Sequence, residues 1–258
     1  MNKTKEQWDT AAVDYQRVAK LGLNEYNSSL LCFWQEKGMI CDGARVLDIG
    51  CGVGKYGMYL AELGCEVTLT DISEEMLRHA RTNMARFKTP WTVFQCDFDK
   101  VSGKESAFAG GFDLSISTMS PAVHDLATVR KMSTMTRGWC FLARFYSWRQ
   151  PVRDEFLSML GLPAEPAMGD MKTDCENIIA AVSAAGFAPH VEYADYNWRD
   201  IRTAEEFAEH MHRRHPTVAG LDRRQLIGCA EKLALDGIIT DEVYTKVAWI
   251  YWRSEGKE

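Results

Sequence analysis

The residues best suited to chemistry gather first around a glycine-rich turn. Residues 46–57 read VLDIGCGVGKYG, in which an apolar run leads into Asp48 and then into Gly50, Gly52 and Gly54. Glycine allows backbone conformations with positive φ and lacks the Cβ that would hold a ligand away from the backbone. We therefore expect a ligand to lie against this turn.

The turn fits two kinds of site. Gly52, Gly54 and Gly57 match the GxGxxG pattern of dinucleotide sites, in which the first glycine ends the strand and the loop faces a pyrophosphate. In this chain Gly50 ends the expected strand, and Asp48 lies two residues before it. A carboxylate at Asp48 would repel phosphate groups, whereas it suits a cationic amino-acid tail.

Two further acids follow the next apolar runs. Asp71 lies about 20 residues after the turn, where a carboxylate accepts hydrogen bonds from ribose hydroxyls. Asp97 is followed by Phe98, and a carboxylate beside an aromatic ring suits the amine and the face of an adenine. Asp48 could also merely stabilise the turn, Asp71 could cap a helix, and Asp97 could lie in a surface loop. Because ligands of open α/β sheets bind beyond the carboxyl ends of strands, the three acids together favour a nucleoside site.

These residues need strands and helices to position them. Hydrophobic patterning predicts strands at residues 45–49, 66–70, 91–95, 112–117, 138–145, 190–196 and 244–252. It predicts helices at residues 5–38, 55–63, 73–87, 121–136, 152–160 and 175–185, and a helical insertion at 203–235. Strands that alternate with helices imply a parallel sheet covered on both faces.

With these motifs the sequence resembles the class I S-adenosylmethionine (SAM)-dependent methyltransferases, particularly small-molecule enzymes similar to the ubiquinone and menaquinone biosynthesis type. The resemblance covers about residues 8–145, and the remainder only by topology. It implies an α/β fold with a Rossmann-like, seven-stranded, mostly parallel sheet, helices on both faces, an antiparallel last strand, an N-terminal helical lid and a helical insertion before the last strand. We expect one domain over residues 1–258, with the lid in 1–40, the cofactor-binding core in 41–150 and the substrate-side helices and last two strands in 151–258.

The resemblance also implies SAM as the cofactor and S-adenosylhomocysteine (SAH) as its product. The residues expected at the cofactor are Asp48, Gly50, Cys51, Gly52, Gly54, Asp71, Ile72, Met76, Asp97, Phe98 and Ser117.

Two residues are candidates for accepting a proton from the methyl acceptor. Methyl transfer from a sulfonium is an in-line displacement in which positioning outweighs acid or base catalysis. His124 is one candidate, since its ordinary pKa of about 6.5 suits a base at neutral pH. Tyr15 is the other, because with Trp8 and Ala12 it forms a W-x-x-x-A-x-x-Y pattern like that of the lid in the resembling enzymes. His124 could equally be a polar residue of a helix's first turn, and Tyr15 a packing residue of the lid.

The acceptor itself is expected to be a small, partly apolar metabolite. Residues 120–123 read SPAV, without the second proline and the aromatic of the [DNS]-P-P-[YFW] motif that many amino-methylating enzymes carry. The expected substrate contacts are Met119, Arg144, Trp148 and Trp198, and the expected pocket lies between the N-terminal helix and residues 151–235. The alternatives are a methyltransferase acting on RNA or protein, a non-catalytic SAM-binding protein and an NAD-binding enzyme.

Composition limits the partners. The net charge of −6 gives no chain-wide attraction to nucleic acid. The basic segment 210–215 (HMHRRH), followed by Arg223 and Arg224, suits a solvated helix surface, an anionic contact or, least well, a metal site, and we expect no bound metal. No segment approaches the roughly 20 apolar residues that span a bilayer. Eight cysteines without a CxxC pair, and no apolar signal segment, predict a cytoplasmic protein; the sequence does not indicate the oligomeric state.

Overall fold

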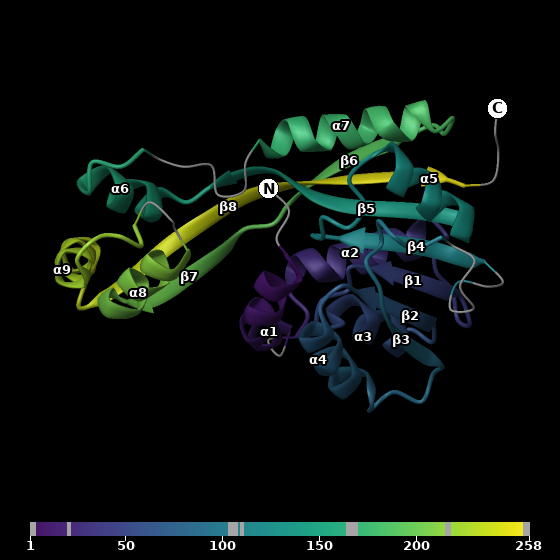
Figure 1. Cartoon of the computed structure of the whole chain (residues 1–258), viewed down its shortest axis with the longest axis horizontal. Helices are drawn as coiled ribbons and strands as arrows, with labels where there is room; N and C mark the ends of the chain where they lie inside the picture. Colours follow the sequence, from purple (N-terminus) through teal and green to yellow (C-terminus); the bar gives the residue numbers. More distant parts are fainter. Residues whose placement is uncertain are drawn as a thin grey trace. The chain divides into compact units, whose positions relative to one another are not determined.

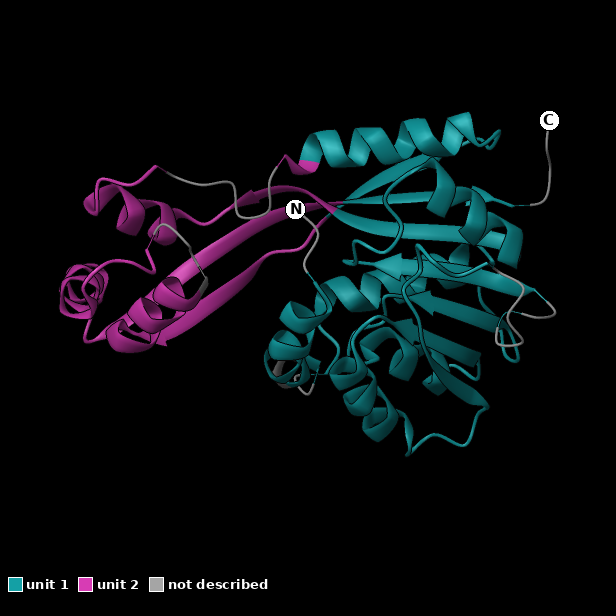
Figure 2. Ribbon diagram, viewed as in Figure 1, with its two compact units in different colours: residues 1–144, 172–194, 248–258 teal, residues 145–171, 195–247 magenta. Residues whose placement is uncertain are grey.

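The chain divides into two compact units. The computed structural model describes residues 4–19, 22–102, 108, 111–163, 170–214 and 218–254 (Figure 1). Unit 1 comprises residues 1–144, 172–194 and 248–258, and unit 2 comprises residues 145–171 and 195–247 (Figure 2). The boundary falls within two long strands, β5 (Thr136–Arg149) and β8 (Ile238–Arg253).

A parallel ladder forms the centre of unit 1. Strand β1 (Arg45–Ile49) pairs in parallel with β2 (Glu66–Asp71) on one side and with β4 (Phe112–Thr118) on the other. Strand β3 (Trp91–Gln95) continues the ladder from β2, and β5 continues it from β4. The strand order is β3-β2-β1-β4-β5-β8-β6, with β6 at His190–Asp195, so the chain reverses its direction of travel across the sheet between β1 and β4. Such a switch point is where open α/β sheets bind ligands.

The central strands are buried because helices cover the sheet. Leu47, Ile49, Leu114 and Ile116 have no exposed surface. Strands buried on both faces read as continuous apolar runs, which explains the sequence pattern of β1 and β4. The helices of unit 1 are α1 (Lys5–Ala19), α2 (Glu25–Glu36), α3 (Lys55–Glu62), α4 (Glu74–Met84), α5 (Leu126–Met135) and α7 (Met171–Ala184).

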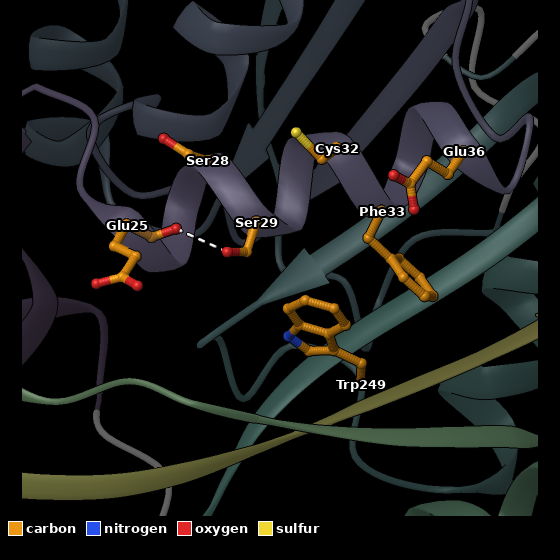
Figure 3. Close-up of a pocket in the computed structure, with 7 residues that line it drawn as sticks. All are labelled: Glu25, Ser28, Ser29, Cys32, Phe33, Glu36 and Trp249. Carbon is orange, nitrogen blue, oxygen red and sulfur yellow. Dashed lines mark hydrogen bonds between the residues drawn. The ribbon is translucent and has the colours of Figure 1, made fainter.

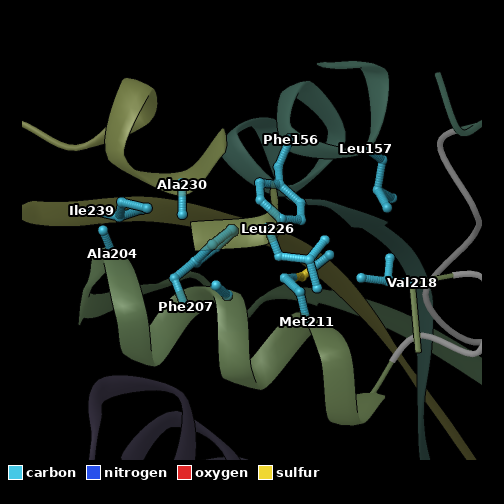
Figure 4. Close-up of a cluster of buried hydrophobic side chains, with 10 residues drawn as sticks. Phe156, Leu157, Ala204, Phe207, Met211, Val218, Leu226, Ala230 and Ile239 are labelled. Carbon is cyan, nitrogen blue, oxygen red and sulfur yellow. The ribbon is translucent and has the colours of Figure 1, made fainter. Parts of the chain in front are cut away.

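Unit 2 has an apolar core of its own. Helices α6 (Pro151–Met159), α8 (Ala204–Arg214) and α9 (Arg223–Leu233) accompany β7 (Trp198–Thr203), which pairs with β8 in antiparallel fashion. Buried residues of these elements, among them Phe156, Phe207 and Leu226, form one cluster (Figure 4). The rings of Phe156 and Phe207 meet edge to face with centroids 5.3 Å apart.

The mostly parallel α/β sheet with helices on both faces is confirmed, but the strand count is not. The sheet has eight strands, since residues 198–203 form β7 where a loop after the sixth strand was expected. The sequence WRDIRT hides this strand because its residues alternate between exposed and half-buried positions and half of them are charged. The last strand is also longer than the expected 244–252, because β8 begins at Ile238 to pair with β7.

Two predicted helices also differ from the structure. The expected helix 5–38 is divided at Gly22, whose φ is +76°, and Asn24 then caps α2 by accepting a hydrogen bond from the backbone N of Asn27 at 2.9 Å. The expected helix 121–136 begins only at Leu126, because Asp125 forms a capping box with Thr128. Among the described residues, no helix is long and apolar enough to cross a membrane.

The core of unit 2 depends on one buried acid of β8. Asp241 has no exposed surface, and its two carboxylate oxygens accept hydrogen bonds from the backbone N of Val152 at 3.0 Å and of Arg153 at 2.9 Å. These donors are the otherwise unsatisfied N–H groups at the start of α6. Asp241 therefore joins α6 to the strand.

We expect Asp241→Ala to lower the free energy of unfolding by about 1–3 kcal/mol, since it removes a helix cap and leaves buried donors unpaired. Urea unfolding, followed by hydrogen exchange of unit 2 amides, measures the effect. Glu242→Ala is the matched control, because Glu242 forms only an exposed ion pair with Arg199 at 2.7 Å and should change stability by less than about 1 kcal/mol. Equal stabilities of the two variants would contradict the capping role.

Candidate functional site

The loop between β1 and α3 owes its shape to glycines and to the end of β2. Gly50, Gly52 and Gly54 have φ values of +71°, +54° and +77°. The backbone N of Gly50 donates to the carbonyl of Thr70 at 2.8 Å, and that of Gly52 donates to Oδ2 of Asp71 at 2.9 Å. The second strand therefore holds the loop in place.

The glycines of this loop make room for different neighbours. A Cβ at Gly50 would lie 1.9 Å from Oγ of Ser120, so the missing side chain lets the segment after β4 approach. A Cβ at Gly52 would meet only Sδ of Met76, at 3.8 Å. Of these two glycines, Gly52 is the one beside which a ligand has room.

Two buried polar groups beside this loop have no hydrogen-bond partner among the described residues. They are both carboxyl oxygens of Asp48 and the hydroxyl of Ser117, and neither residue has exposed surface. Asp48 pairs with Ile116 across β1 and β4, which places Ser117 one residue further along the neighbouring strand. Buried polar atoms are nearly always bonded, and leaving one unpaired costs about 1–3 kcal/mol. This arrangement favours a polar ligand at the carboxyl ends of β1 and β4.

Burial also sets the charge of Asp48. Desolvation, and then the negative charge of Asp71, raise the pKa of the Asp48 carboxyl to about 8. The group is therefore mostly protonated at neutral pH until a positive charge approaches it.

Asp71, which is expected to bind ribose hydroxyls, also holds the glycine loop through hydrogen bonds. Its two oxygens accept hydrogen bonds from the backbone N of Gly52 and of Ser73, each at 2.9 Å. Burial raises the pKa of this carboxyl, while the backbone donors lower it. A carboxylate offers about four acceptor positions, so two remain for ribose hydroxyls.

The third acidic motif lies nearer the surface. Asp97 is 28% exposed and forms an ion pair with Nζ of Lys100 at 2.8 Å, and this contact lowers the pKa of the carboxyl. The ring of Phe98 is only 4% exposed, and Nζ of Lys131 lies 5.3 Å from its centroid. Phe98 therefore has little free surface for stacking in this conformation.

The remaining expected cofactor residues are also enclosed. Met76 is 2% and Cys51 is 8% exposed, while Ile72 is half-buried. Burial raises the pKa of the Cys51 thiol well above its usual value, so the thiol stays protonated. Cys51 can therefore contribute shape to the site but not charge.

Helix α1 is hydrogen-bonded to both cofactor loops through residues that the sequence patterns did not identify. Oδ1 of Asp9 accepts from Oγ of Ser73 at 2.5 Å. Gln16 and Asn83 exchange two side-chain hydrogen bonds of 2.9 and 2.8 Å, and Nδ2 of Asn83 also donates to the carbonyl of Val53 at 2.8 Å. Asp9 and Gln16 lie seven residues apart and therefore on one helix face. This spacing of polar residues is the sequence feature that could have indicated their contacts.

Tyr15 lies at the edge of this contact. Its side chain is 39% exposed, and its ring meets that of Trp8 edge to face at 6.1 Å. Among the α1 side chains that the structure describes, those of Ala12, Gln16 and Ala19 are buried instead.

The segment after β4 is held by a half-buried arginine. Met119 has a φ of +52°, a left-handed conformation that is strained for a residue other than glycine. The guanidinium of Arg144 donates to the carbonyls of Ser117 and of Val123, each at 2.8 Å. Burial lowers the pKa of Arg144 to about 10, so the side chain remains charged at neutral pH. Arg144 therefore fixes the path of the chain beside Ser117.

The other candidates for the acceptor side lie in different places. His124 is exposed and precedes α5, rather than lying in its first turn, and its Nε2 is 3.8 Å from Oδ1 of Asp99. Trp148 and Trp198 belong to unit 2, where their rings meet edge to face at 5.0 Å. The prediction that these residues line one acceptor pocket stays a prediction.

The basic segment is partly neutralised. Arg223 forms ion pairs with Glu205 at 3.8 Å and with Glu209, while His215 lies outside the described residues. In the described part of the chain, no group of three or more His, Cys, Asp or Glu side chains could hold a metal ion.

Two glycine substitutions test which glycine packs against the protein and which lies beside free space. Gly50→Ala and Gly52→Ala should each cost about 1–2 kcal/mol of stability, because both positions have positive φ. Gly50→Ala should cost about 1–3 kcal/mol more, since the new methyl group overlaps Ser120. Thermal and urea unfolding measure both variants, and a Gly52 variant as unstable as the Gly50 variant would contradict the assignment of free space.

The comparisons with known proteins agree with this geometry. A methyltransferase domain family matches residues 46–137. Malonyl-[acyl-carrier protein] O-methyltransferase of Enterobacter lignolyticus is 52% identical over 42 residues, which are 16% of this chain and 17% of that protein. The SAM-dependent Diels-Alderase iccD of Talaromyces variabilis is 33% identical over 72 residues, 27% of this chain and 25% of that protein. Ubiquinone biosynthesis O-methyltransferase of Xanthomonas campestris is 49% identical over 39 residues, 15% of this chain and 16% of that protein. The matches thus span about a quarter or less of the length of these relatives.

A solved structure shows the same fold over a longer stretch. Phosphoethanolamine N-methyltransferase 2 of Haemonchus contortus, in complex with phosphomonomethylethanolamine and SAH, is 17% identical, with a TM-score of 0.52 over 95% of this chain and 57% of that one. This likeness concerns the fold alone. Residues 46–137, which carry the glycine turn and the acids at the ends of β1 and β2, thus match a methyltransferase domain family, and over this segment the chain is similar to SAM-dependent methyltransferases.

Proposed function

We propose that this protein transfers a methyl group from SAM to a small-molecule acceptor by in-line displacement. The observation that carries the proposal is the pair of buried, unpartnered polar groups of Asp48 and Ser117 beside the Gly52 turn. Buried polar atoms without a partner in the protein are groups that a bound polar ligand can satisfy.

The residues present fit the parts of SAM. Asp48 suits the cationic end of its amino-acid tail, because an approaching positive charge favours the carboxylate form. Asp71 has acceptor positions left for the ribose hydroxyls. Asp97 is proposed to lie at the adenine amine, where its half-exposed ion pair with Lys100 can rearrange. Bound SAM supplies an electrophilic methyl group on a sulfonium sulfur.

The protein contributes to methyl transfer mainly by positioning the cofactor and the acceptor. Asp9 and Gln16 hold α1 against the two loops that would carry the cofactor, so α1 can limit the access of water. Arg144 holds the segment that would face the acceptor. His124 and Tyr15 are the proposed acceptors for the proton that the nucleophile loses, and no acid is required because the sulfur leaves as a neutral thioether.

Several observations support a small-molecule acceptor. Two relatives that match part of the cofactor-binding segment are named malonyl-[acyl-carrier protein] O-methyltransferase and ubiquinone biosynthesis O-methyltransferase. The chain has a net charge of −6, which does not attract a polyanion. The described cysteines are free thiols, as in a protein of the reducing cytoplasm.

Two alternatives call for tests that separate binding from chemistry. A methyltransferase acting on RNA or protein would bind the same cofactor. So would a SAM-dependent protein that does not transfer the methyl group, and one matching relative is named as a Diels-Alderase. Binding of SAM therefore cannot establish the reaction by itself.

The raised pKa of Asp48 predicts proton release on cofactor binding. The free carboxyl, with a pKa of about 8, is mostly protonated at pH 7, and a bound ammonium group would lower that pKa. Binding of SAH should therefore release about 0.5–1 proton at pH 7, and its affinity should increase as the pH rises towards 8. Calorimetry in buffers with different ionisation enthalpies counts the protons.

Asp48→Asn is the control for this measurement. Its amide has a similar shape but no titratable proton, so proton release and the pH dependence between 6 and 8 should disappear, apart from a constant loss of affinity. Proton release that persists in this variant would refute the assignment of Asp48 to the cationic tail.

The acceptor class can be tested with SAM that carries a labelled methyl group. The protein is incubated with short acyl thioesters, hydroxylated aromatic rings or phosphoethanolamine, and separately with total RNA and with unfolded protein. We expect label to move into a small-molecule fraction. Label found only in RNA or protein would favour the polymer alternative, and SAH-competent protein that labels none of these classes would favour the non-catalytic one.

A further inference from the structure

A buried asparagine of α2, like Asp48 and Ser117, has a polar side chain without a hydrogen-bond partner among the described residues. Asn27 is 1% exposed, and neither the oxygen nor the nitrogen of its carboxamide has a hydrogen-bond partner among the described residues. Its backbone N donates to Asn24, so the helix cap is made by another residue and needs nothing from the Asn27 side chain. A leucine would suit this position better if packing were its only purpose.

The contacts of α2 place Asn27 at the carboxyl edge of the sheet. The ring of Trp139 lies 5.8 Å from that of Tyr251, and the ring of Phe141 lies 6.3 Å from that of Trp249, so β5 and β8 run in opposite directions. At the end of α2, Nζ of Lys37 lies 5.6 Å from the ring of Tyr251.

The start of α2 lies at the other end of this contact. Tyr26 accepts a hydrogen bond from Nε1 of Trp249 at 3.1 Å. The helix start therefore lies towards the carboxyl end of β5, which runs parallel to β4 and so to the end where Ser117 lies. The ring of Trp34 of α2 lies 5.3 Å from that of Phe141, which pairs with Ile116, and Ile116 pairs with Asp48. Paired residues of parallel strands share a face, so the side chain of Asp48 points to the face of the sheet that α2 covers.

Asn27 faces the interior and not the open pocket on the other side of the same helix. That pocket is lined by Glu25, Ser28, Ser29, Cys32, Phe33, Glu36 and Trp249 (Figure 3). It contains none of the acids of the glycine loop. The unpaired carboxamide thus faces the interior, on the side of the sheet to which Asp48 points.

We propose that Asn27 binds the α-amino acid end of the cofactor, together with Asp48. A zwitterionic amino acid needs acceptors for its ammonium group and donors for its carboxylate. The carboxamide of Asn27 supplies one of each, and Asp48 supplies a second acceptor. The two unpartnered side chains thereby match the two charges of one ligand end. This assignment rests on the proposed use of SAM.

Asn27→Leu tests the assignment, because leucine keeps the approximate shape of asparagine and removes both polar atoms. Affinity is measured by calorimetry for SAH and for 5′-methylthioadenosine, which shares the adenosine and the sulfur but has no amino-acid end. We expect SAH affinity to fall about 10- to 100-fold, as for a lost hydrogen bond to a charged group, and methylthioadenosine affinity to change less than about 2-fold. The midpoint of thermal unfolding without ligand should stay equal or rise, since a buried unpaired amide has been removed.

Two further variants complete the experiment. Ser28→Leu makes a similar change one residue later, at an exposed position, and should alter neither affinity. Asn27→Ala adds no bulk, and it should reproduce the selective loss of SAH affinity even if leucine disturbs the packing.

The outcomes separate this inference from the function on which it rests. Unchanged SAH affinity in Asn27→Leu and Asn27→Ala, or equal losses for both ligands, would overturn the role of Asn27 while the proposed use of SAM stands. Wild-type protein that binds neither ligand would overturn the proposed function itself, and the inference with it.

Discussion

The parallel pairing of β1 with β2 and β4 is the constraint on which the site depends. It places the carboxyl ends of neighbouring strands at one edge, so Asp48 and Ser117 lie at adjacent strand ends, with side chains on opposite faces of the sheet, although 69 residues separate them in the sequence. The pairing also buries them, because helices cover both faces of the sheet. A polar group that is buried but unbonded is costly, and at least three such side chains, those of Asp48, Ser117 and Asn27, belong to this half of the protein. We interpret these unpaired side chains as groups that bind a ligand.

Other polar groups around the site form hydrogen bonds within the protein and so avoid the free-energy cost of being buried unpaired. Thr70 and Asp71 accept hydrogen bonds from the glycine loop, and Arg144 binds the carbonyls that follow β4. These contacts fix the shape of the loops without using the groups of Asp48. The site therefore combines a rigid frame with unsatisfied polar atoms. A frame of this kind suits methyl transfer, in which alignment of the reacting atoms contributes more than acid or base catalysis.

Charge within the site is coupled to occupancy. Burial, and then the negative charge of Asp71, disfavour the ionisation of Asp48 and raise the pKa of its carboxyl to about 8. A cationic ligand reverses this balance, because it stabilises the carboxylate that burial penalises. The helix α1, bonded to Ser73 and Asn83, lies directly on the loops where this change of charge would occur.

The sequence by itself determined the motifs and the class of fold. Strand and glycine patterns are local, so β1, α3, β2 and β3 could be placed within a residue or two, and the acids at their ends were identified from spacing. Only the tertiary structure decided which polar groups remain unpaired. Asn27 reads as an ordinary helix residue in the sequence, and the division of the N-terminal helix at Gly22 together with the packing of α2 is what buries it. The strand β7 was missed for a related reason, because its charged, alternating residues show a strand only when β8 is beside them. Pairing and burial depend on residues distant in the chain, and no local pattern records them.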